Sequence, residues 1–370
     1  MILEVQLNHL WGIRPGKHGQ PFGRELRKKV RIAERVMMDN LKKFYIDGAW
    51  VDPVSHTDFD VIHPGNEEKI ATIALGSAAD VDKAVDAATR AFKTWQFSTV
   101  EERLALLERM IVAYEKRAEE FIRIMPYEMG TTMSFSRDVQ MPVGIGHLEA
   151  TIEALKAHQF ERPSPRGGST LVDEPVGVVG MITPWNWPVN QIMIKVAPAL
   201  AAGCTIVLKP SEYSPLSAIM LAEVIDEAGC PAGVFNLLNG DGASVGEAIS
   251  AHPGIDMVSF TGSTRAGKLV TKSAADTIKR VTLELGGKSP NLLFADADLD
   301  QAAQVAVDAC FINNGQSCDA GSRLLVERSV YDEVVDRVTK IVENTHVDDP
   351  MKEGDHIGPV VNAKQYEHVQ

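Results

Sequence analysis

Residues 176–208 have the sequence VGVVGMITPWNWPVNQIMIKVAPALAAGCTIVL, and this stretch decides the fold. Its first seven residues, Val176 to Ile182, are apolar or glycine, which is typical of a buried strand. After a turn with two prolines and two tryptophans, Pro188 to Ala202 has helical character and is closed by Gly203. A second apolar strand follows at Thr205 to Leu208. This order predicts a βαβ unit with parallel strands.

The same alternation continues downstream. Further strands are predicted at 234–238 and 256–260, and further helices at 215–228, 243–250 and 264–275. We therefore expect an α/β fold with an open parallel sheet, in which ligands bind at the carboxyl ends of the strands. A second α/β unit is predicted from about residue 287, with strands at 291–294 and 323–327 and helices at 299–312 and 330–342.

Two features precede the sheet. Residues 79–125 predict two helices, and Thr99 with Glu102 forms a capping box for the second. Between about residues 160 and 175, turn material at Arg162 to Gly168 is followed by a short strand-like run at Ser169 to Val172.

The first 37 residues differ from the rest in charge, with eight basic and three acidic side chains. A mitochondrial transit peptide would be rich in serine, and this segment has none. We interpret residues 1–40 as an extension outside the fold, with a targeting arm as the alternative. Phe44 to Gly48 is typical of the start of a domain.

Composition excludes several classes of protein. A net charge of −13 argues against a nucleic-acid partner. No apolar run approaches the roughly 18 residues that a membrane helix needs, so we expect no membrane partner. The cysteines show no CxxC or zinc-like spacing, which predicts no metal, and their scarcity predicts a reducing, cytoplasmic location. They are Cys204, Cys230, Cys310 and Cys318.

Cys318 lies in the polar loop Asn314 to Cys318, between a predicted helix and a predicted strand. A free cysteine is most often a small buried apolar residue, and Cys204 and Cys310 fit that description. Cys318 does not fit it, because Cys318 lies in a polar loop rather than in an apolar strand or helix. Loops of this kind often carry nucleophiles. We predict that Cys318 is a reactive thiol.

Two further residues have chemical potential. Glu284 stands among Leu283, Leu285 and two glycines, which predicts a paired or partly desolvated carboxylate, suited either to a structural ion pair or to general-base catalysis. Asn186, in the turn Thr183 to Pro188, is either the N-cap of the next helix or a fixed N–H donor for an oxyanion.

The remaining motifs suit a nucleotide. Lys209 and Glu212 follow a strand and can hydrogen-bond ribose hydroxyls, although a solvated pair is the simpler alternative. Glycine-rich segments at Gly240 to Gly246 and Phe260 to Thr264 follow two other strands. The second opens a helix whose N-terminus is suited to a pyrophosphate, but neither matches the GxGxxG pattern.

Together these motifs resemble the NAD(P)-dependent aldehyde dehydrogenase family, from about Phe44 to the last residue. The most specific are Leu283 to Pro290 and Gly315 to Cys318. The resemblance implies a Rossmann-type cofactor domain over residues 41–286, with an oligomerisation hairpin inserted at 155–175. It also implies that residues 287–370 are the first part of the catalytic domain.

The resemblance implies roles for single residues. Cys318 would be the nucleophile, Glu284 the base that activates water, and Asn186 the oxyanion donor. The cofactor would be NAD, with NADP as an alternative, and Lys195 would lie near the active site. The residues implied to line the cofactor groove are Thr183, Trp185, Lys209, Ser211, Glu212, Gly242, Gly246, Phe260, Gly262, Ser263 and Leu285.

The implied reaction oxidises an aldehyde to a carboxylic acid through a thioester on Cys318. One alternative is a relative that passes the acyl group to coenzyme A, although such relatives generally lack Glu284. Another is an inactive fragment that only binds nucleotide, because the family continues for roughly another quarter of its length past Gln370. A homodimer or homotetramer is expected at full length. Asp319 departs from expectation, because an acid beside the nucleophile disfavours the thiolate.

Overall fold

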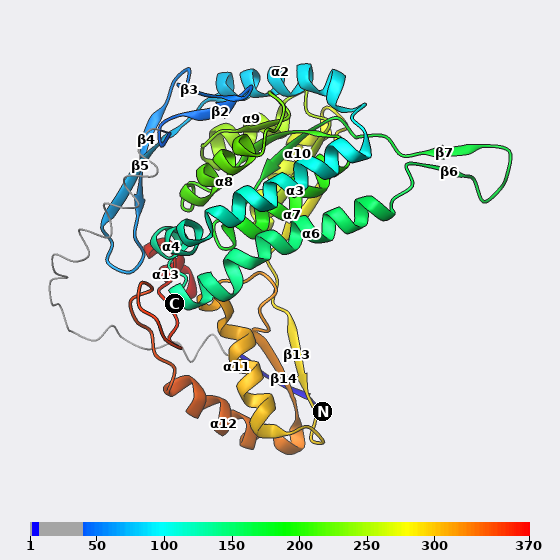
Figure 1. Ribbon diagram of the computed structural model, residues 1–370. Coiled ribbons are helices and arrows are strands. Elements are labelled where there is room, and N and C mark those ends of the chain that lie inside the picture. The colour runs from blue at the N-terminus through cyan, green and yellow to red at the C-terminus, as the bar shows by residue number, and fades with distance from the viewer. Residues whose placement is uncertain (1, 7–39) are drawn as a thin grey trace.

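The computed structural model describes residues 2–6 and 40–370, and the chain forms two α/β units (Figure 1). The larger unit is built on a seven-stranded sheet whose strand order is β12-β11-β8-β9-β10-β2-β3. In chain order these strands are β2 (Phe44–Ile46), β3 (Ala49–Val51), β8 (Val178–Ile182), β9 (Thr205–Lys209), β10 (Phe235–Leu237), β11 (Met257–Gly262) and β12 (Arg280–Leu285).

The five strands from β12 to β10 are parallel, as the alternation of strands and helices predicts, whereas β2 and β3 add an antiparallel edge. All residues of β8 and β9 are buried, which explains their continuous apolar sequence. β12 is an edge strand, and its residues alternate between exposed and half-buried.

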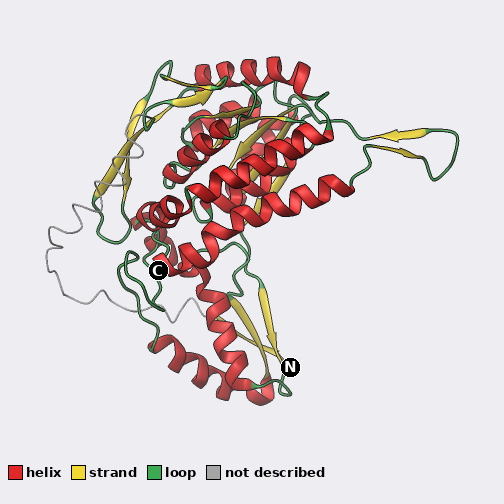
Figure 2. Cartoon of the chain, in the orientation of Figure 1, coloured by secondary structure: helices red, strands yellow, loops and turns green. Residues whose placement is uncertain are grey.

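Helices cover both faces of this sheet (Figure 2). Val179 and Met181 of β8 face a core shared with α3 (Val100–Lys116), α4 (Ala118–Met129), α6 (Met141–Ala157), α7 (Pro188–Ala201) and α8 (Leu216–Glu227). Val178 and Ile182 face the opposite core, with α2 (Ala78–Trp95), α9 (Glu247–Ala251) and α10 (Thr264–Ala275). The sheet is therefore doubly wound.

Shorter elements complete the larger unit. Residues 79–125 form three helices rather than the two predicted, because the chain breaks again at Arg117, but the Thr99–Glu102 capping box is confirmed. The remaining elements are the hairpin β4 (Thr57–Ile62) and β5 (Lys69–Leu75), the short helix α5 (Met133–Phe135), the π-helical turns η2 (Ser136–Gln140) and η3 (Gly242–Gly246), and the projecting hairpin β6 (Glu161–Pro163) and β7 (Thr170–Val172).

The smaller unit has its own core, formed by β13 (Pro290–Leu293), α11 (Leu299–Gly315), β14 (Arg323–Glu327) and α12 (Tyr331–Glu343). The turn η4 (Arg328–Val330) and the helix α13 (Ala363–Val369) complete it. β1 (Ile2–Gln6) pairs antiparallel with β14, so the structure differs from the prediction that residues 1–40 lie outside the fold. The rest of that predicted extension, residues 7–39, lies outside the described residues.

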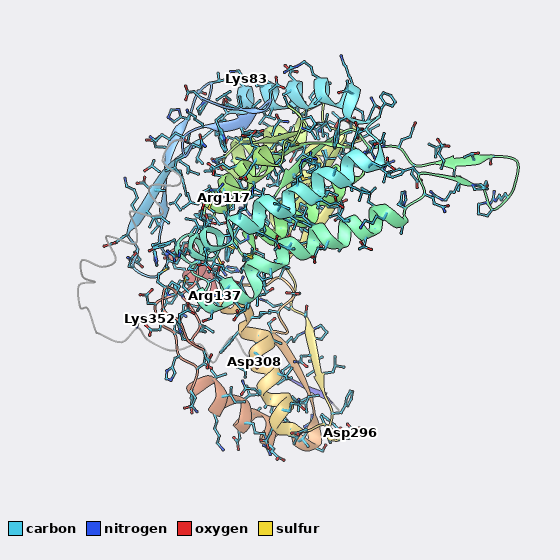
Figure 3. The ribbon with its side chains drawn as sticks, in the orientation of Figure 1. Lys83, Arg117, Arg137, Asp296, Asp308 and Lys352 are labelled. Carbon is cyan, nitrogen blue, oxygen red and sulfur yellow. The ribbon has the colours of Figure 1, made fainter. Side chains whose placement is uncertain are left out.

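A bidentate ion pair helps to join the two units. Arg137 of η2 donates to both carboxylate oxygens of Glu353, at 2.9 and 2.6 Å. Figure 3 shows Arg137 beside the segment that carries Lys352. Both partners are solvent-exposed, so the pair contributes little to stability.

Glu128 of α4 is a fully buried carboxylate that connects two helices of the larger unit. It accepts the backbone N–H groups of Leu216 (2.6 Å) and Ser217 (3.2 Å), which begin α8 and have no partner within that helix. Burial raises the pKa of Glu128 to about 7, although these N–H groups favour the charged form.

Glu128→Gln should therefore change how stability depends on pH. The raised pKa means that native Glu128 costs stability progressively as the pH rises from about 4.5 to about 7, by up to about 3 kcal/mol. Glutamine keeps an acceptor oxygen and never ionises. The free energy of unfolding of the variant should therefore rise relative to that of the native protein between pH 5 and pH 8. Urea unfolding at both pH values measures this. Exposed Glu119→Gln on the same helix is the control, and parallel pH profiles for Glu128→Gln would contradict the account.

Candidate active site

The carboxyl ends of the parallel strands bring the predicted site residues to one edge of the sheet. Ile182 is opposite Lys209, Phe260 is opposite Ile182, and Gly262 is opposite Leu285. The segments that follow these residues, including the turn that begins at Thr183, therefore emerge side by side. The positions agree with the general location of ligand sites in doubly wound sheets.

Asn186 does not cap the following helix. The N-cap residue of α7 is Trp187, without a side-chain cap bond, so the capping interpretation of Asn186 is wrong. The Asn186 side chain instead points across to the cysteine loop, where Nδ2 donates to the carbonyl oxygen of Gln316 at 2.7 Å. This bond uses one of the two Nδ2 hydrogens, and the second is left for another acceptor.

The loop that carries Cys318 begins with three successive residues of positive φ: Asn313 (54°), Asn314 (59°) and Gly315 (70°). Asparagine and glycine tolerate this left-handed conformation better than other residues. Ile312 (ψ 135°) is already non-helical, so the helical part of α11 ends at Phe311, just before the predicted end at Ile312, and the chain then turns sharply.

Buried amides hold this turn in place. Asn313 Nδ2 and Gln140 Nε2 both donate to the Asn186 carbonyl oxygen, at 2.7 and 3.3 Å, and Gln140 also donates to Asn313 Oδ1 at 3.0 Å. Asn314 donates to the Gly130 carbonyl oxygen at 2.7 Å, and Gln316 Oε1 accepts from the Val361 N–H at 2.9 Å. The cysteine loop is thus bound to four other segments of the chain.

Cys318 is the exposed cysteine of the chain, whereas Cys204, Cys230 and Cys310 are buried. Partial burial raises the pKa of the Cys318 thiol, and the neighbouring Asp319 carboxylate raises it further, as the sequence predicts for an acid beside the nucleophile. Burial also raises the pKa of Cys310, to about 11. Exposure therefore distinguishes Cys318 as the accessible thiol.

Glu284 lies near the end of β12, and its negative charge acts on the Cys318 thiol. The glycine segment after it reaches the cysteine loop, because a Cβ added to Gly287 would lie 3.5 Å from the Cys318 carbonyl oxygen. The prediction that Glu284 is paired or partly desolvated is wrong, because its side chain is exposed on the edge strand and forms no ion pair within the described residues. Its charge also acts on Lys195, which donates to Ser259 Oγ at 3.0 Å.

Lys195 is buried in α7, and its environment differs from that of a surface lysine. Burial lowers the pKa of Lys195 to about 8, and the Glu284 carboxylate opposes this shift. The buried ammonium of Lys195 is therefore held by the Ser259 hydroxyl and stabilised by the charge of Glu284.

Lys209 is buried, and Nζ donates to the carbonyl oxygens of Pro210 and Gly240, both at 2.7 Å. Glu212 Oε2 lies 3.4 Å from the same nitrogen. The two residues are therefore a positioned pair rather than the solvated pair that was the simpler alternative. Burial lowers the pKa of Lys209, and Glu212 opposes this shift.

The glycine-rich segments lie beside this pair. A Cβ added to Gly246 would lie 3.9 Å from Lys209 Cδ, and one added to Gly242 would meet nothing within 4 Å. Ser263 is the N-cap of α10, and its hydroxyl accepts the Ala266 N–H at 3.2 Å. Of the other predicted groove residues, Thr183, Ser211 and Phe260 are buried, and Trp185 and Leu285 are half-buried.

The sequence profile of the aldehyde dehydrogenase family matches residues 50–370. The chain belongs to this family. It is therefore an enzyme of the class that oxidises aldehydes to carboxylic acids. As an aldehyde dehydrogenase it is 48% identical, over 334 residues, to 3-succinoylsemialdehyde-pyridine dehydrogenase from a Pseudomonas species, and covers 70% of that protein's length. The alignment covers 90% of this chain.

Solved aldehyde dehydrogenases have the same fold. The enzyme from Bartonella henselae matches with a TM-score of 0.86 and 50% identity, over 88% of this chain and 69% of that one. Aldehyde dehydrogenase C from Pseudomonas syringae, in a cysteine-to-alanine mutant complexed with NAD+ and octanal, matches with a TM-score of 0.87 and 46% identity. That alignment covers 89% of this chain and 67% of the other.

Membrane-spanning helices and metal clusters are both absent from the described part of the chain. No helix in residues 2–6 and 40–370 is long and apolar enough to cross a membrane. Nor do these residues contain a group of three or more histidine, cysteine, aspartate or glutamate side chains that could hold a metal ion.

Sequence reasoning missed the amides that position the site. Gln140 lies in η2, far from every predicted motif, and its contact with Asn313 spans 173 positions of the chain. Asn313 gave a local signal, because the run Asn313-Asn314-Gly315 is typical of left-handed backbone. No comparable signal marks Gln140.

Asn186→Ala removes both the loop anchor and the remaining amide hydrogen. If that hydrogen binds an oxyanion, kcat should fall about 10²–10³-fold, and loss of the anchor should lower the free energy of unfolding by about 1 kcal/mol. Asn313→Ala is the matched variant, because it removes a bond to the Asn186 backbone and leaves the Asn186 side chain intact. It should cost more stability, because alanine tolerates the positive φ of 54° at this position poorly, but it should cause a smaller loss of kcat. Equal losses of kcat in the two variants would assign Asn186 a structural role only.

Proposed function

We propose that this aldehyde dehydrogenase oxidises its substrate with NAD+ through a thioester on Cys318, which water activated by Glu284 then hydrolyses. One observation carries the proposal. The exposed thiol of Cys318 stands on a loop tied to Asn186, within the electrostatic influence of Glu284, at the carboxyl edge of a doubly wound sheet.

The groove residues fit a dinucleotide. The Thr183 hydroxyl is buried without a partner in the described part of the chain, which suits a group that receives a bond from a ligand. Space is open above Gly242, and α10 begins at Ser263 with backbone N–H groups suited to a pyrophosphate. Glu212, held near Lys209, would accept a ribose hydroxyl, which favours NAD over NADP as the alternative. When bound, NAD+ would accept the hydride from the substrate carbon.

The side chains of this chain would act in sequence. The Cys318 thiolate adds to the aldehyde carbon, and the resulting alkoxide is stabilised by the free Asn186 amide hydrogen. Departure of hydride from that carbon leaves a thioester on the sulfur. Glu284 then takes a proton from water, and the hydroxide attacks the thioester carbon, which releases the carboxylic acid and restores the thiolate.

The alternatives differ in what they require of Glu284. Transfer of the acyl group to coenzyme A needs no base for water, so a carboxylate acting on the Cys318 thiol favours hydrolysis. Exposure on an edge strand does not exclude this role, because a general base needs access to water. A chain that only bound nucleotide would need neither group.

We also propose a cytoplasmic homo-oligomer. All four cysteines are free thiols, which suits a reducing compartment. The hairpin β6–β7 projects from the larger unit (Figure 1) and exposes Leu171 (40%) and Val172 (55%). Two three-residue strands are not stable alone in water, so this hairpin would gain by pairing with a second copy of the chain.

Cys318→Ala should abolish NADH formation from NAD+ and an aldehyde while NAD+ binding persists, because the thiol forms the covalent intermediate. Absorbance of NADH and a calorimetric NAD+ titration measure the two properties. Cys230→Ala, at a buried thiol outside the site, is the control and should remain active. Iodoacetamide should also modify Cys318 faster than the three buried cysteines. Turnover by Cys318→Ala, or equal labelling of all four thiols, would remove Cys318 from the mechanism.

Glu284→Gln should separate the two half-reactions, because the base is needed only after hydride has left. Mixing enzyme, NAD+ and aldehyde should give a rapid burst of about one NADH per active site, followed by slow turnover. Mass spectrometry should then find an acyl group on Cys318. Normal steady-state turnover in a folded Glu284→Gln enzyme, with no trapped acyl group, would show that Glu284 is not the base.

A further inference from the structure

Asp319 is held in place beside the nucleophile by a chain of hydrogen bonds. Trp187 Nε1 donates to Ser317 Oγ at 3.0 Å, and the Ser317 hydroxyl donates to Asp319 Oδ1 at 2.5 Å. Trp187 is buried, 7% exposed, and its ring contacts Phe135 with the centroids 5.6 Å apart. The carboxylate is therefore fixed by a rigid side chain of the larger unit, although Asp319 itself is exposed.

The charged side chains that act on the Cys318 thiol are both acids. Asp319 follows it directly in the loop, and the charge of Glu284 acts on it from near the end of β12. Partial burial is the largest cause that raises the pKa of the thiol, and the charge of Asp319 is the next. The charge of Glu284 raises this pKa further. The same negative potential acts on any charged group of a substrate whose aldehyde carbon approaches the sulfur.

The mechanism uses Glu284 as a base but has no use for Asp319. If its only effect were to slow formation of the thiolate, the Asp319 carboxylate would lower the rate of the reaction and assist no step. Its fixed position gives it a different consequence, because an aldehyde that carries a carboxylate near the reacting carbon must approach two like charges, whereas a neutral or cationic aldehyde need not.

We propose that Asp319, tethered through Ser317 to Trp187, is a specificity-determining residue that selects against anionic aldehydes and in favour of neutral or cationic ones. The preference among aldehydes rests on the proposed function. The negative electrostatic potential at the Cys318 sulfur does not, because it exists without a substrate. Coulomb's law, for like charges several ångströms apart in a highly polar medium near the protein surface, gives a discrimination of roughly three- to tenfold.

Alkylation of the free thiol tests the potential without cofactor or turnover. Iodoacetamide and iodoacetate both form a sulfur–carbon bond with the thiolate and release iodide, but only iodoacetate is anionic. The ratio of their rate constants at one pH cancels the fraction of thiolate. Relative to N-acetylcysteine amide, the full protein should favour iodoacetamide by roughly three- to tenfold, and 1 M NaCl should reduce this preference.

Asp319→Asn should bring the ratio down toward that of the free thiol. The control is Asp296→Asn, an exposed acid at the far end of the smaller unit (Figure 3), which should leave the ratio unchanged. Ser317→Ala keeps the charge and removes the tether, so it should lower the ratio partly. An unchanged ratio in Asp319→Asn would overturn the proposal, and an unchanged ratio in Ser317→Ala would overturn the role of the tether.

Steady-state kinetics test the consequence for substrates. Asp319→Asn should raise kcat/KM for 4-oxobutanoate relative to neutral pentanal by roughly three- to tenfold, and should lower it for the cationic 4-(trimethylammonio)butanal relative to pentanal. Equal changes for all three aldehydes would contradict a role in specificity. If none of the aldehydes is oxidised by the native enzyme, the proposed function fails, whereas the alkylation ratio still decides whether Asp319 sets the potential.

Discussion

The backbone carbonyl oxygen of Asn186 is the point on which the site depends. It accepts from Gln140 and from Asn313, so both of its lone pairs are used by side chains from other segments. The Asn186 side chain then holds the cysteine loop through the Gln316 carbonyl. A change at any of these amides would leave a buried polar group without a partner, which costs more than the bond alone contributes. The position of Cys318 therefore depends on residues that take no part in the chemistry.

Much of the fold could be predicted because the central strands are buried on both faces. Every residue of β8 and β9 is buried, and short continuous apolar runs of this kind are typical of strands in a covered parallel sheet. The hairpin β4–β5 could not be found in this way, since Thr57–Ile62 mixes acidic and apolar residues and is mostly exposed. Gln140 was missed for another reason. A single glutamine in a helical segment resembles a surface residue, and only its distant partner Asn313 reveals its role.

Glu284 shows where a sequence pattern misleads. Its apolar neighbours Leu283 and Leu285 suggest a buried strand, but β12 is at the edge of the sheet and only one of its faces is covered. The side chain at position 284 belongs to the open face. The alternation of apolar and polar residues in Arg280–Leu285 itself predicts an exposed Glu284, so the expected desolvation followed from its apolar neighbours and not from the period.

Position and reactivity are controlled by different kinds of side chain in this site. The groups that fix the start of the cysteine loop, Asn313 to Gln316, are amides, which keep the same charge at every pH, so these contacts do not depend on protonation. The groups that set the reactivity of the thiol are carboxylates, Asp319 and Glu284. A carboxylate that assists water in the second half-reaction necessarily opposes formation of the thiolate in the first. Both demands can be met at one sulfur only if its position is fixed independently of charge, and the amides provide that independence.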